Sequence, residues 1–477
     1  MREDARWLTM NDGIQLDASV CLPDGAVPPG GWPAVILVHG HGEDGSKAST
    51  LPRGRRLAGE GYVTLCYSVR GQGGSEGQSF HLGAQEIFDL QVVVDTALRE
   101  LPIHPERLAV CGSSQGGWHS WMAAAHCPQV ATVVPENIFV DYADFAVPDG
   151  ALSTWFFTRT MRRRVVSAGL QGLARRWAID GAWDRLRAWL APMSPIRFTD
   201  RIQAPVLCVH GWHDVGMPAN DLIKMFGALD VPRRLVLGGG GHDGQDEDSV
   251  AAARVDLIDR WLSHWLRGDD TGILDEPSIT YVRRPGWTHH GTDRIGGGQE
   301  HTLYLSVDDT LSEAAPTAPA ANKNIDHTPR DPAYTLSVAL HHDLVGSREA
   351  WPRQEACFDG PILTHDLDLL GAPRFQLYTL PSRPFGQIHA ELHDVAPDGS
   401  STLITRGHQG FCTATPGAHR RCEITARAIA HRVAAGHRLR VVVCDQHPDY
   451  VVPVYRPWRS RLYCEVGRAS SVTLPLG

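Results

Sequence analysis

The chain has 477 residues, more than a single hydrophobic core can organise, so we expect two or three domains. Hydrophobic residues make up 42% of it and charged residues 21%, as in ordinary globular proteins, and no apolar run is long enough to span a bilayer. The formal net charge of -9 provides no basic surface for nucleic acid. We therefore expect neither a membrane span nor a nucleic-acid partner.

The N-terminal residues 1–17 mix both charges and lack the apolar stretch of a signal peptide, so we expect a cytoplasmic protein. The chain has no Cys-x-x-Cys pair and no cysteine at zinc spacing from a histidine, and we expect no metal. Several of the ten cysteines lie in strand-like apolar runs, where buried and reduced thiols are expected: Cys66, Cys111, Cys208 and Cys444.

From about residue 15 to 270, strand-length apolar runs alternate with helical patterns, which is typical of βαβ units around a largely parallel sheet. The expected strands cover residues 15–19, 34–39, 62–67, 107–111, 130–135, 205–210 and 234–237. The expected helices cover residues 54–60, 85–101, 118–126, 220–228 and 249–267. This order predicts an α/β core.

Residues 141–195 interrupt the alternation, because they show helical patterns where the sheet should continue. The interruption predicts a helical cap inserted into the core. Its arginines fit either a solvated helix face or contact with an anionic substrate; they include Arg162, Arg163, Arg164, Arg175 and Arg176.

Beyond residue 270 the helical pattern almost disappears, which predicts an all-β sandwich or jelly roll. Short alternating segments cover 301–306, 374–380, 388–394, 439–445 and 461–466, and the Ala/Pro/Thr-rich stretch 312–323 is expected to be an exposed loop. The expected domains are the first part of the core at 1–140, the cap at 141–195, the second part of the core at 196–272 and the β domain at 273–477.

Residues 112–116, Gly-Ser-Ser-Gln-Gly, match the G-x-S-x-G pattern of a nucleophile elbow with Ser114 at its centre. Ser75 lies in a second match, but only Ser114 has a strand before it and a helix directly after it. That context lifts a serine hydroxyl above the sheet edge, and the flanking glycines allow the tight turn. We therefore predict Ser114 as the nucleophile and expect Ser113 to be a supporting residue that points away from the cleft.

A serine nucleophile needs a general base and an acid that orients the base; in this fold the chain order is Ser, acid, His. Asp214 ends the loop after the sixth expected strand, and His242 ends the glycine-rich loop after the seventh. Asp243 and Asp246 compete as acids, but they lie too close to His242 in sequence to approach it from a neighbouring loop. We therefore predict a triad of Ser114, His242 and Asp214.

Other histidines near the strand ends have different expected roles. His39 and His210 are expected to be hydrogen-bonded structural residues, and His213 precedes the acid, which is the wrong order for the base. A metal site at His39 and His41 is an alternative interpretation, but the spacing of two residues brings no further ligands.

The oxyanion of an acyl-transfer reaction needs two hydrogen-bond donors. One expected donor is the backbone N–H of Gln115, at the start of the helix after the elbow, and the other lies in the glycine-rich loop 39–44. The glycines of this loop let the backbone turn its amides inward. We predict the backbone N–H of His41 as the second donor.

With these motifs, the chain resembles the serine hydrolases grouped with cocaine esterase, α-amino acid ester hydrolases and X-Pro dipeptidyl-peptidases. The resemblance implies an α/β-hydrolase fold with an inserted helical cap, a C-terminal jelly-roll domain of the galactose-binding type, acyl transfer and no cofactor. Besides the triad, it rests on residues 70–77 (Arg-Gly-Gln-Gly-Gly-Ser-Glu-Gly), 86–90, 303–305, 331–332, 391–399 and 436–440.

The chain also departs from this group. Members that resemble cocaine esterase use a tyrosine side chain in the oxyanion loop, where this chain has His41 and Gly42. The oxyanion hole is therefore expected to consist of backbone amides, as in esterases resembling acetyl xylan esterases, which often carry Ser-Gln-Gly-Gly at the elbow. The cap is short for a peptidase, and no cluster of carboxylates for a free α-amino group stands out, so these features count against peptide and amino-ester substrates.

We therefore expect a serine hydrolase that cleaves a small-molecule carboxylic ester through an acyl-enzyme, with its pocket walled by the cap and by loops of the β domain. One alternative is an amide or peptide hydrolase, either an acylase or an X-Pro dipeptidyl-peptidase. Another, from a different class, is a non-catalytic carbohydrate-binding or scaffold protein. The sequence leaves the substrate and homo-oligomerisation open.

Overall fold

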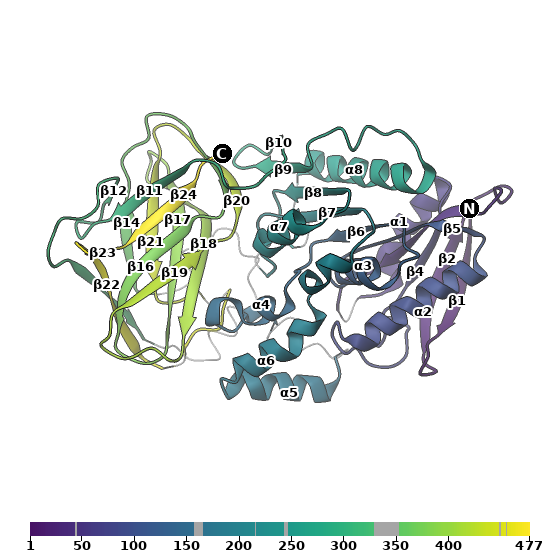
Figure 1. The fold of residues 1–477 in the computed structure, drawn as a ribbon, viewed down its shortest axis with the longest axis horizontal. Helices are drawn as coiled ribbons and strands as arrows, with labels where there is room; N and C mark the ends of the chain where they lie inside the picture. Colours follow the sequence, from purple (N-terminus) through teal and green to yellow (C-terminus); the bar gives the residue numbers. More distant parts are fainter. Residues whose placement is uncertain are drawn as a thin grey trace. The chain divides into compact units, whose positions relative to one another are not determined.

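The structure, a computed structural model, describes residues 1–42, 45–156, 166–214, 216–242, 247–328, 353–447, 450–454 and 456–477. The chain divides into two compact units (Figure 1). The first unit comprises residues 1–145, 159–282 and 289–293, and the second comprises residues 146–158, 283–288 and 294–477.

The first unit is built on a ten-stranded sheet with the order β1-β2-β4-β3-β5-β6-β7-β8-β9-β10. The pairs β1–β2 and β2–β4 are antiparallel, and the pairs from β4 to β9 are parallel. The strands are β1 (Arg2–Thr9), β2 (Gln15–Leu22), β3 (Trp32–Val38), β4 (Val63–Tyr67), β5 (Ile103–Ser113), β6 (Thr132–Glu136), β7 (Val206–Gly211), β8 (Arg233–Gly238), β9 (Ile279–Arg283) and β10 (Thr288–Thr292).

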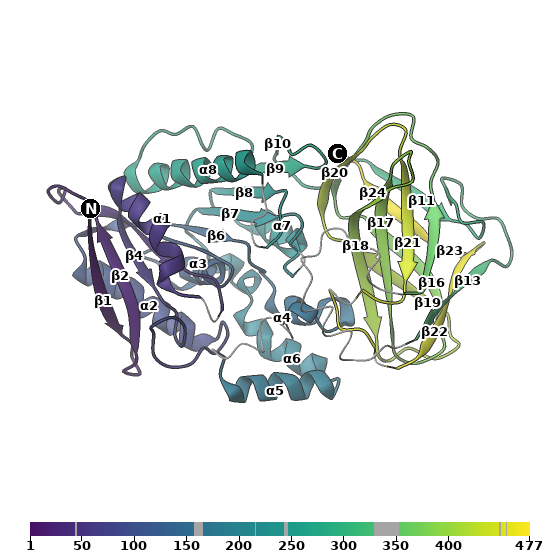
Figure 2. The same cartoon turned by 180° about the vertical axis from the view of Figure 1, so that it is seen from behind.

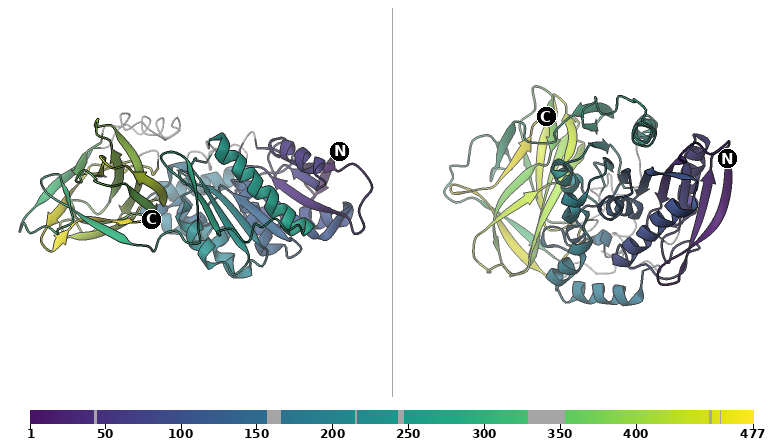
Figure 3. Two further views of the ribbon diagram at one scale, coloured as in Figure 1. Left: turned by 90° about the horizontal axis from the view of Figure 1, so that it is seen from above. Right: turned by 45° about the vertical axis from the view of Figure 1, so that its right-hand side comes forward.

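Helices lie on both faces of this sheet (Figures 1 and 2), which confirms the expected α/β class. Figure 3 shows α8 running across the strands. Its apolar face, centred on Trp261, packs against alternate strand residues such as Leu37 and Val209, and Gly268 ends the helix in a left-handed conformation. The long helices are α1 (Lys47–Gly59), α2 (Ala84–Glu100), α3 (Gln115–His126), α7 (Ala219–Ala228) and α8 (Asp248–Arg267).

The parallel arrangement decides where functional residues gather. β3, β5, β7 and β8 run in the same direction, so the loops that follow them meet at one edge of the sheet. These four loops carry the residues predicted for the oxyanion hole, the nucleophile, the acid and the base.

Between β6 and β7, the described residues form helices and no strand of the sheet, as expected for a cap. Arg175 and Arg176 are exposed on one of these helices, which fits a solvated face, while Arg162, Arg163 and Arg164 lie outside the described residues. The helices are α4 (Tyr142–Ala146), α5 (Ala168–Ile179) and α6 (Trp183–Leu190), with 3-10 turns at Pro148–Gly150, Ala191–Met193 and Pro195–Arg201.

The predicted domain boundaries need two corrections. Residues 146–158, assigned to the cap, belong to the second unit, where the N–H of Val452 donates to the Leu152 carbonyl (2.8 Å) and that of Thr154 donates to the Tyr450 carbonyl (3.2 Å). The core also extends beyond residue 272, because β9 pairs in parallel with β8 and β10 lies at the end of the same sheet.

Beyond residue 156, the described residues of the second unit form strands and loops, and these strands form sheets of eight, four and two strands. Residues of the two larger sheets share one hydrophobic core, as in a sandwich. Its strands are β11 (Glu300–Leu305), β12 (Leu311–Ser312), β13 (Asn322–His327), β14 (Glu355–Asp359), β15 (Leu367–Gly371), β16 (Arg374–Pro381), β17 (Gly386–Val395), β18 (Ser401–Phe411), β19 (Arg420–Thr425), β20 (Ile429–Val433), β21 (Arg438–Cys444), β22 (Trp458–Glu465), β23 (Arg468–Ala469) and β24 (Ser471–Pro475).

The cysteines expected to be structural are buried thiols: Cys66, Cys111, Cys208 and Cys444. Burial raises the pKa of Cys66 and of Cys111 to about 12. In the part of the chain that the structure describes, no helix has both the length and the apolar character to cross a membrane.

Candidate active site

Ser114 occupies the turn between β5 and α3, as the elbow pattern predicts. Its φ of 55° and ψ of -119° are unusual for a residue with a side chain, and such strain is typical of nucleophile elbows. The turn fits only because its glycines let α3 approach β3: a Cβ at Gly116 would lie 2.0 Å from the Val38 carbonyl oxygen. The N–H of Ser114 donates to the Glu136 carbonyl on β6 (2.9 Å), which fixes the turn to the sheet.

His242 lies on the loop after β8 and reaches the serine. Its Nε2 is 3.1 Å from Ser114 Oγ, and its Nδ1 is 2.7 Å from Asp214 Oδ2. Because a carboxylate only accepts hydrogen bonds, Nδ1 carries the proton and the lone pair of Nε2 can accept from the serine hydroxyl. The structure thus brings together the three residues predicted as a triad.

Asp214 is fully buried after β7. Its second oxygen, Oδ1, accepts from the N–H groups of Gly216 (3.1 Å) and Met217 (2.9 Å). Burial alone would raise the pKa of Asp214, but the charge and hydrogen bond of His242 and the N–H of Met217 act against it, so the pKa is lowered. The carboxylate is therefore held in its ionised form.

The acid and base loops are also bound to each other through their backbones. The N–H of Trp212 donates to the Gly238 carbonyl (3.0 Å), and that of His213 donates to the Gly240 carbonyl (3.1 Å). A Cβ at Gly211 would lie 2.4 Å from the Gly240 carbonyl oxygen, so only glycine permits this approach. The distance between Asp214 and His242 is consequently set by strand ends rather than by side chains alone.

The loop after β3 lies beside the nucleophile. A Cβ at Gly40 would be 3.6 Å from Ser114 Cβ. His39, which directly follows β3, donates from Nδ1 to the Gly40 carbonyl (2.7 Å) and accepts at Nε2 from the N–H of Val69 (2.9 Å). Burial lowers the pKa of His39 to about 4, so it is a neutral structural residue, as expected.

A hydrogen-bond network that was not predicted from the sequence ties this loop to α3. The N–H of Gly42 donates to Gln72 Oε1 (3.1 Å), which fixes the orientation of the Gln72 amide, and its Nε2 donates to Gln115 Oε1 (3.0 Å). His41 Nδ1 lies 2.8 Å from the same Gln115 oxygen and therefore carries a proton. The two residues predicted as oxyanion donors are thus joined through their side chains, while their backbone amides stay predictions as donors.

A second feature that was not predicted is the strained loop beside this network. His81 and Leu82 are buried with φ values of 53° and 62°. The Glu86 carboxylate holds the loop by accepting from the N–H groups of Phe80 (2.6 Å) and Gly83 (3.1 Å). Burial raises the pKa of Glu86 to about 7, although these hydrogen bonds and that of Ser79 act in the opposite direction. The ring of His81 lies 4.9 Å from that of His41, so the loop borders the site.

The rival serines have other surroundings. Ser75 Oγ donates to the Ser68 carbonyl (2.6 Å) and accepts from the N–H of Asp17 (2.8 Å), so it is structural. Ser113, expected to be a packing or hydrogen-bonding residue, is exposed at the end of β5, and its hydroxyl forms no hydrogen bond with the described residues. Among the described residues, neither serine has a base at its hydroxyl.

Two alternatives remain from the sequence: a different acid in the triad and a metal site. Asp243 and Asp246, which competed with Asp214, lie outside the described residues. Within the described ranges, no group of three or more His, Cys, Asp or Glu side chains has the arrangement of a metal site. His39 and His41 each make the hydrogen bonds described above.

The order of strands β1 to β8, the elbow after β5 and the hydrogen-bonded serine and histidine define an α/β hydrolase of the serine type. A profile of the X-Pro dipeptidyl-peptidase S15 family matches residues 12–244, and a profile of the X-Pro dipeptidyl-peptidase C-terminal non-catalytic domain matches residues 272–456. The chain belongs to this family of serine hydrolases, which also confirms the resemblance to the cocaine esterase and dipeptidyl-peptidase group.

Individual relatives agree with this assignment. A Mycobacterium bovis protein named "Putative serine esterase Mb1866c" is 22% identical, with 100% of this chain and 95% of that protein covered. The solved structure of an α-amino acid ester hydrolase has 17% identity and a TM-score of 0.79, covering 100% of this chain and 96% of that one. A CocE/NonD family hydrolase from Staphylococcus aureus has 14% identity and a TM-score of 0.76, covering 100% and 94%. The two structural likenesses establish the fold of the whole chain.

Proposed function

We propose that the chain hydrolyses carboxylic esters through an acyl-enzyme formed on Ser114. The observation that carries this proposal is the continuous hydrogen-bonded series from Ser114 Oγ through His242 to Asp214, with the serine at a strained elbow. A hydroxyl in this setting is activated by the imidazole, and the buried carboxylate orients the imidazole.

In the first half of the reaction, Ser114 Oγ attacks the acyl carbon while its proton passes to His242 Nε2. The oxyanion that forms accepts hydrogen bonds from the backbone N–H groups of Gln115 and His41, the former at the positive end of α3. His242 then donates its proton to the leaving alkoxide, and the ester C–O bond breaks. Asp214 stabilises the imidazolium that exists between these two proton transfers.

In the second half, a water molecule attacks the acyl-enzyme and gives a proton to His242. Collapse of the second tetrahedral intermediate releases the carboxylic acid and returns the proton to Ser114. This cycle needs no cofactor, since every proton transfer uses His242.

The ester preference is supported by the name of the mycobacterial relative and by the chain's departures from the peptidases of its family. Amide or peptide hydrolysis is the second candidate, because the matching family profile is that of X-Pro dipeptidyl-peptidases and the same triad serves both bonds. We also propose the cytoplasm as the location, since all ten cysteines are free thiols.

Two measurements test the proposal. A fluorophosphonate probe followed by intact mass should add one adduct to the wild type and none to Ser114→Ala. An equal adduct on both proteins would exclude Ser114 as the nucleophile. Turnover of a panel of aryl esters and X-Pro anilides should then favour the esters, and faster cleavage of the anilides would assign the chain to peptide hydrolysis instead.

A further inference from the structure

His210 is the second-last residue of β7, four residues before the acid, and is only 2% exposed. Its Nε2 lies 2.6 Å from the backbone carbonyl oxygen of Met217. A carbonyl oxygen only accepts hydrogen bonds, so Nε2 carries the proton and the other nitrogen, Nδ1, has the lone pair. The proposed mechanism does not use this buried imidazole.

The backbone of Met217 connects His210 to the acid, Asp214. The carbonyl of Met217 accepts from His210, and the N–H of Met217 donates to Asp214 Oδ1 (2.9 Å). The opposite carboxylate oxygen of Asp214 binds His242, which in turn reaches Ser114. The imidazole of His210 is therefore the first link in a series of hydrogen bonds that ends at the nucleophile.

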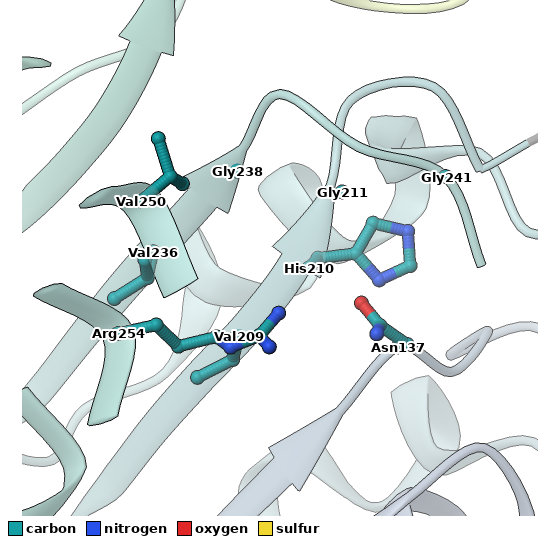
Figure 4. A pocket seen from close by; sticks show the side chains of 9 residues that line it. All are labelled: Asn137, Val209, His210, Gly211, Val236, Gly238, Gly241, Val250 and Arg254. Atoms are coloured by element: carbon teal, nitrogen blue, oxygen red, sulfur yellow. The ribbon is translucent and has the colours of Figure 1, made fainter. Parts of the chain in front are cut away.

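The other side of the His210 ring faces a small pocket, shown in Figure 4. In this view Nδ1 points toward the side chain of Asn137, which follows β6 with a φ of 45°, and Nδ1 has no hydrogen-bond partner among the described residues. The remaining lining residues are Val209, Gly211, Val236, Gly238, Gly241, Val250 and Arg254.

The ring has the protonation state that this contact needs. Burial lowers the pKa of His210 and the charge of His242 acts in the same direction, against the opposing effects of Asp214 and the Met217 carbonyl. Among the described residues, the charged or titratable groups around it are Asp214, His242 and Arg254, which lines the pocket. A neutral ring with its proton on Nε2 is a fixed donor at neutral pH.

We propose that His210 is a positioning residue that fixes the backbone of Met217, so that Asp214 presents one carboxylate oxygen to His242 in the orientation that stabilises the imidazolium. This inference rests on the proposed function, because it assigns His210 a role only through the triad. It predicts a change in kcat and in the pH dependence of the reaction, with little change in KM.

The test compares His210→Leu, which removes the donor, with His210→Gln, whose side-chain amide has a donor at a similar distance from the backbone. We expect His210→Leu to lower kcat by about tenfold with KM changed by less than about twofold, since small misplacements of catalytic groups are costly. The acid limb of its kcat/KM profile should move to lower pH, because a poorly held carboxylate stabilises the His242 imidazolium less. His210→Gln should restore kcat to within about threefold of wild type, and His365→Leu, at an exposed histidine, should match wild type.

A merely structural role for His210 would lower thermal stability and leave the pH profile unchanged, and that result would overturn the inference. Equal kcat values for His210→Leu and His210→Gln would also overturn it. If His210→Leu does not fold, His210→Asn replaces it, because its amide is one methylene too short to reach Met217 and the same comparison with His210→Gln applies. Failure of the wild type to react with the fluorophosphonate probe contradicts the proposed function itself, whereas an unchanged pH profile in a reactive protein contradicts only the role of His210.

Discussion

Asp214 Oδ2 and His242 Nδ1 lie 2.7 Å apart, although one residue follows β7 and the other follows β8. The carboxylate is fully buried, whereas the imidazole keeps 13% of its side chain exposed. The two residues therefore have distinct roles, because the acid stays ionised and fixed while the base keeps access to the serine and to water.

Replacing Asp214 by Asn tests these distinct roles. We expect Asp214→Asn to lower kcat by about 10³- to 10⁴-fold. If the amide oxygen keeps the backbone hydrogen bonds of Oδ1, the amide NH2 faces His242 Nδ1. Nδ1 must then accept a hydrogen bond, which is the wrong tautomer of His242 for catalysis. Ester turnover and the rate of fluorophosphonate labelling should fall together. Asp230→Asn, at an exposed carboxylate, is the control, and a loss below about tenfold in Asp214→Asn would contradict the assigned acid.

Gln72 offers a test of the oxyanion loop without touching the triad. Its amide links the N–H of Gly42 to Gln115 Oε1, so Gln72→Ala should let the loop after β3 move and lower kcat by about tenfold. Gln72→Glu should lower it further, because the carboxylate still accepts from Gly42 but places a second acceptor against the Gln115 oxygen. Michaelis–Menten kinetics on one aryl ester provide the measurement.

The matched control for Gln72 is Gln78→Ala, at an exposed glutamine on the same loop. It should retain wild-type kcat. If Gln72→Ala and Gln72→Glu are as active as Gln78→Ala, the network does not support the oxyanion hole.

Gly116 and Gly227 lie in helices but differ in the space around them. A Cβ at Gly116 would lie 2.0 Å from a backbone oxygen of β3, and a Cβ at Gly227 would meet nothing within 4 Å. We expect Gly116→Ala to lower the free energy of unfolding by about 3 kcal/mol or more. Gly227→Ala should raise it by about 0.5 to 1 kcal/mol, because alanine favours a helix. Urea unfolding of both variants decides this, and a stable, active Gly116→Ala would exclude the close approach.

The elements with strong periodicity and the triad could be predicted from the sequence, since both depend on local patterns. The apolar face of α8 around Trp261 was evident from helical spacing, and the chain order Ser114, Asp214, His242 follows from strand order alone. α1 was expected only from Gly54, although it begins at Lys47, because Pro52 in its second turn lacks an N–H and resembles a helix start.

Other features could not be predicted, because they depend on contacts between distant segments. β1 is mostly exposed and rich in charged residues, so it lacks the alternation of apolar and polar residues that predicts a strand. It is recognised only by its pairing with β2. Gln72 and Gln115 lie 43 residues apart, and nothing local marks either side chain as a partner of the other. The assignment of residues 146–158 to the second unit likewise rests on backbone hydrogen bonds to residues about 300 positions later.

Glu86 makes a prediction about pH and stability. Its pKa of about 7 in the folded protein lies above the ordinary value of 4.5, so between these values the folded state binds more protons than the unfolded state. The contribution of Glu86 is therefore most favourable below pH 4.5 and is lost as the pH rises through 7, by roughly 3 kcal/mol in all. The glutamine of Glu86→Gln does not titrate, so this variant should lack the pH-dependent contribution of Glu86 to the free energy of unfolding.

The measurement is the free energy of unfolding in urea at several pH values from about 5 to 8, for wild type, Glu86→Gln and the exposed control Glu106→Gln. Relative to wild type, Glu86→Gln should gain stability as the pH rises, because the charged carboxylate is the form that burial penalises. Glu106→Gln should run parallel to wild type throughout. Curves for Glu86→Gln and wild type that stay parallel across this range would mean that Glu86 is already ionised at the lowest pH measured, and the backbone N–H groups of Phe80 and Gly83 would then outweigh its burial.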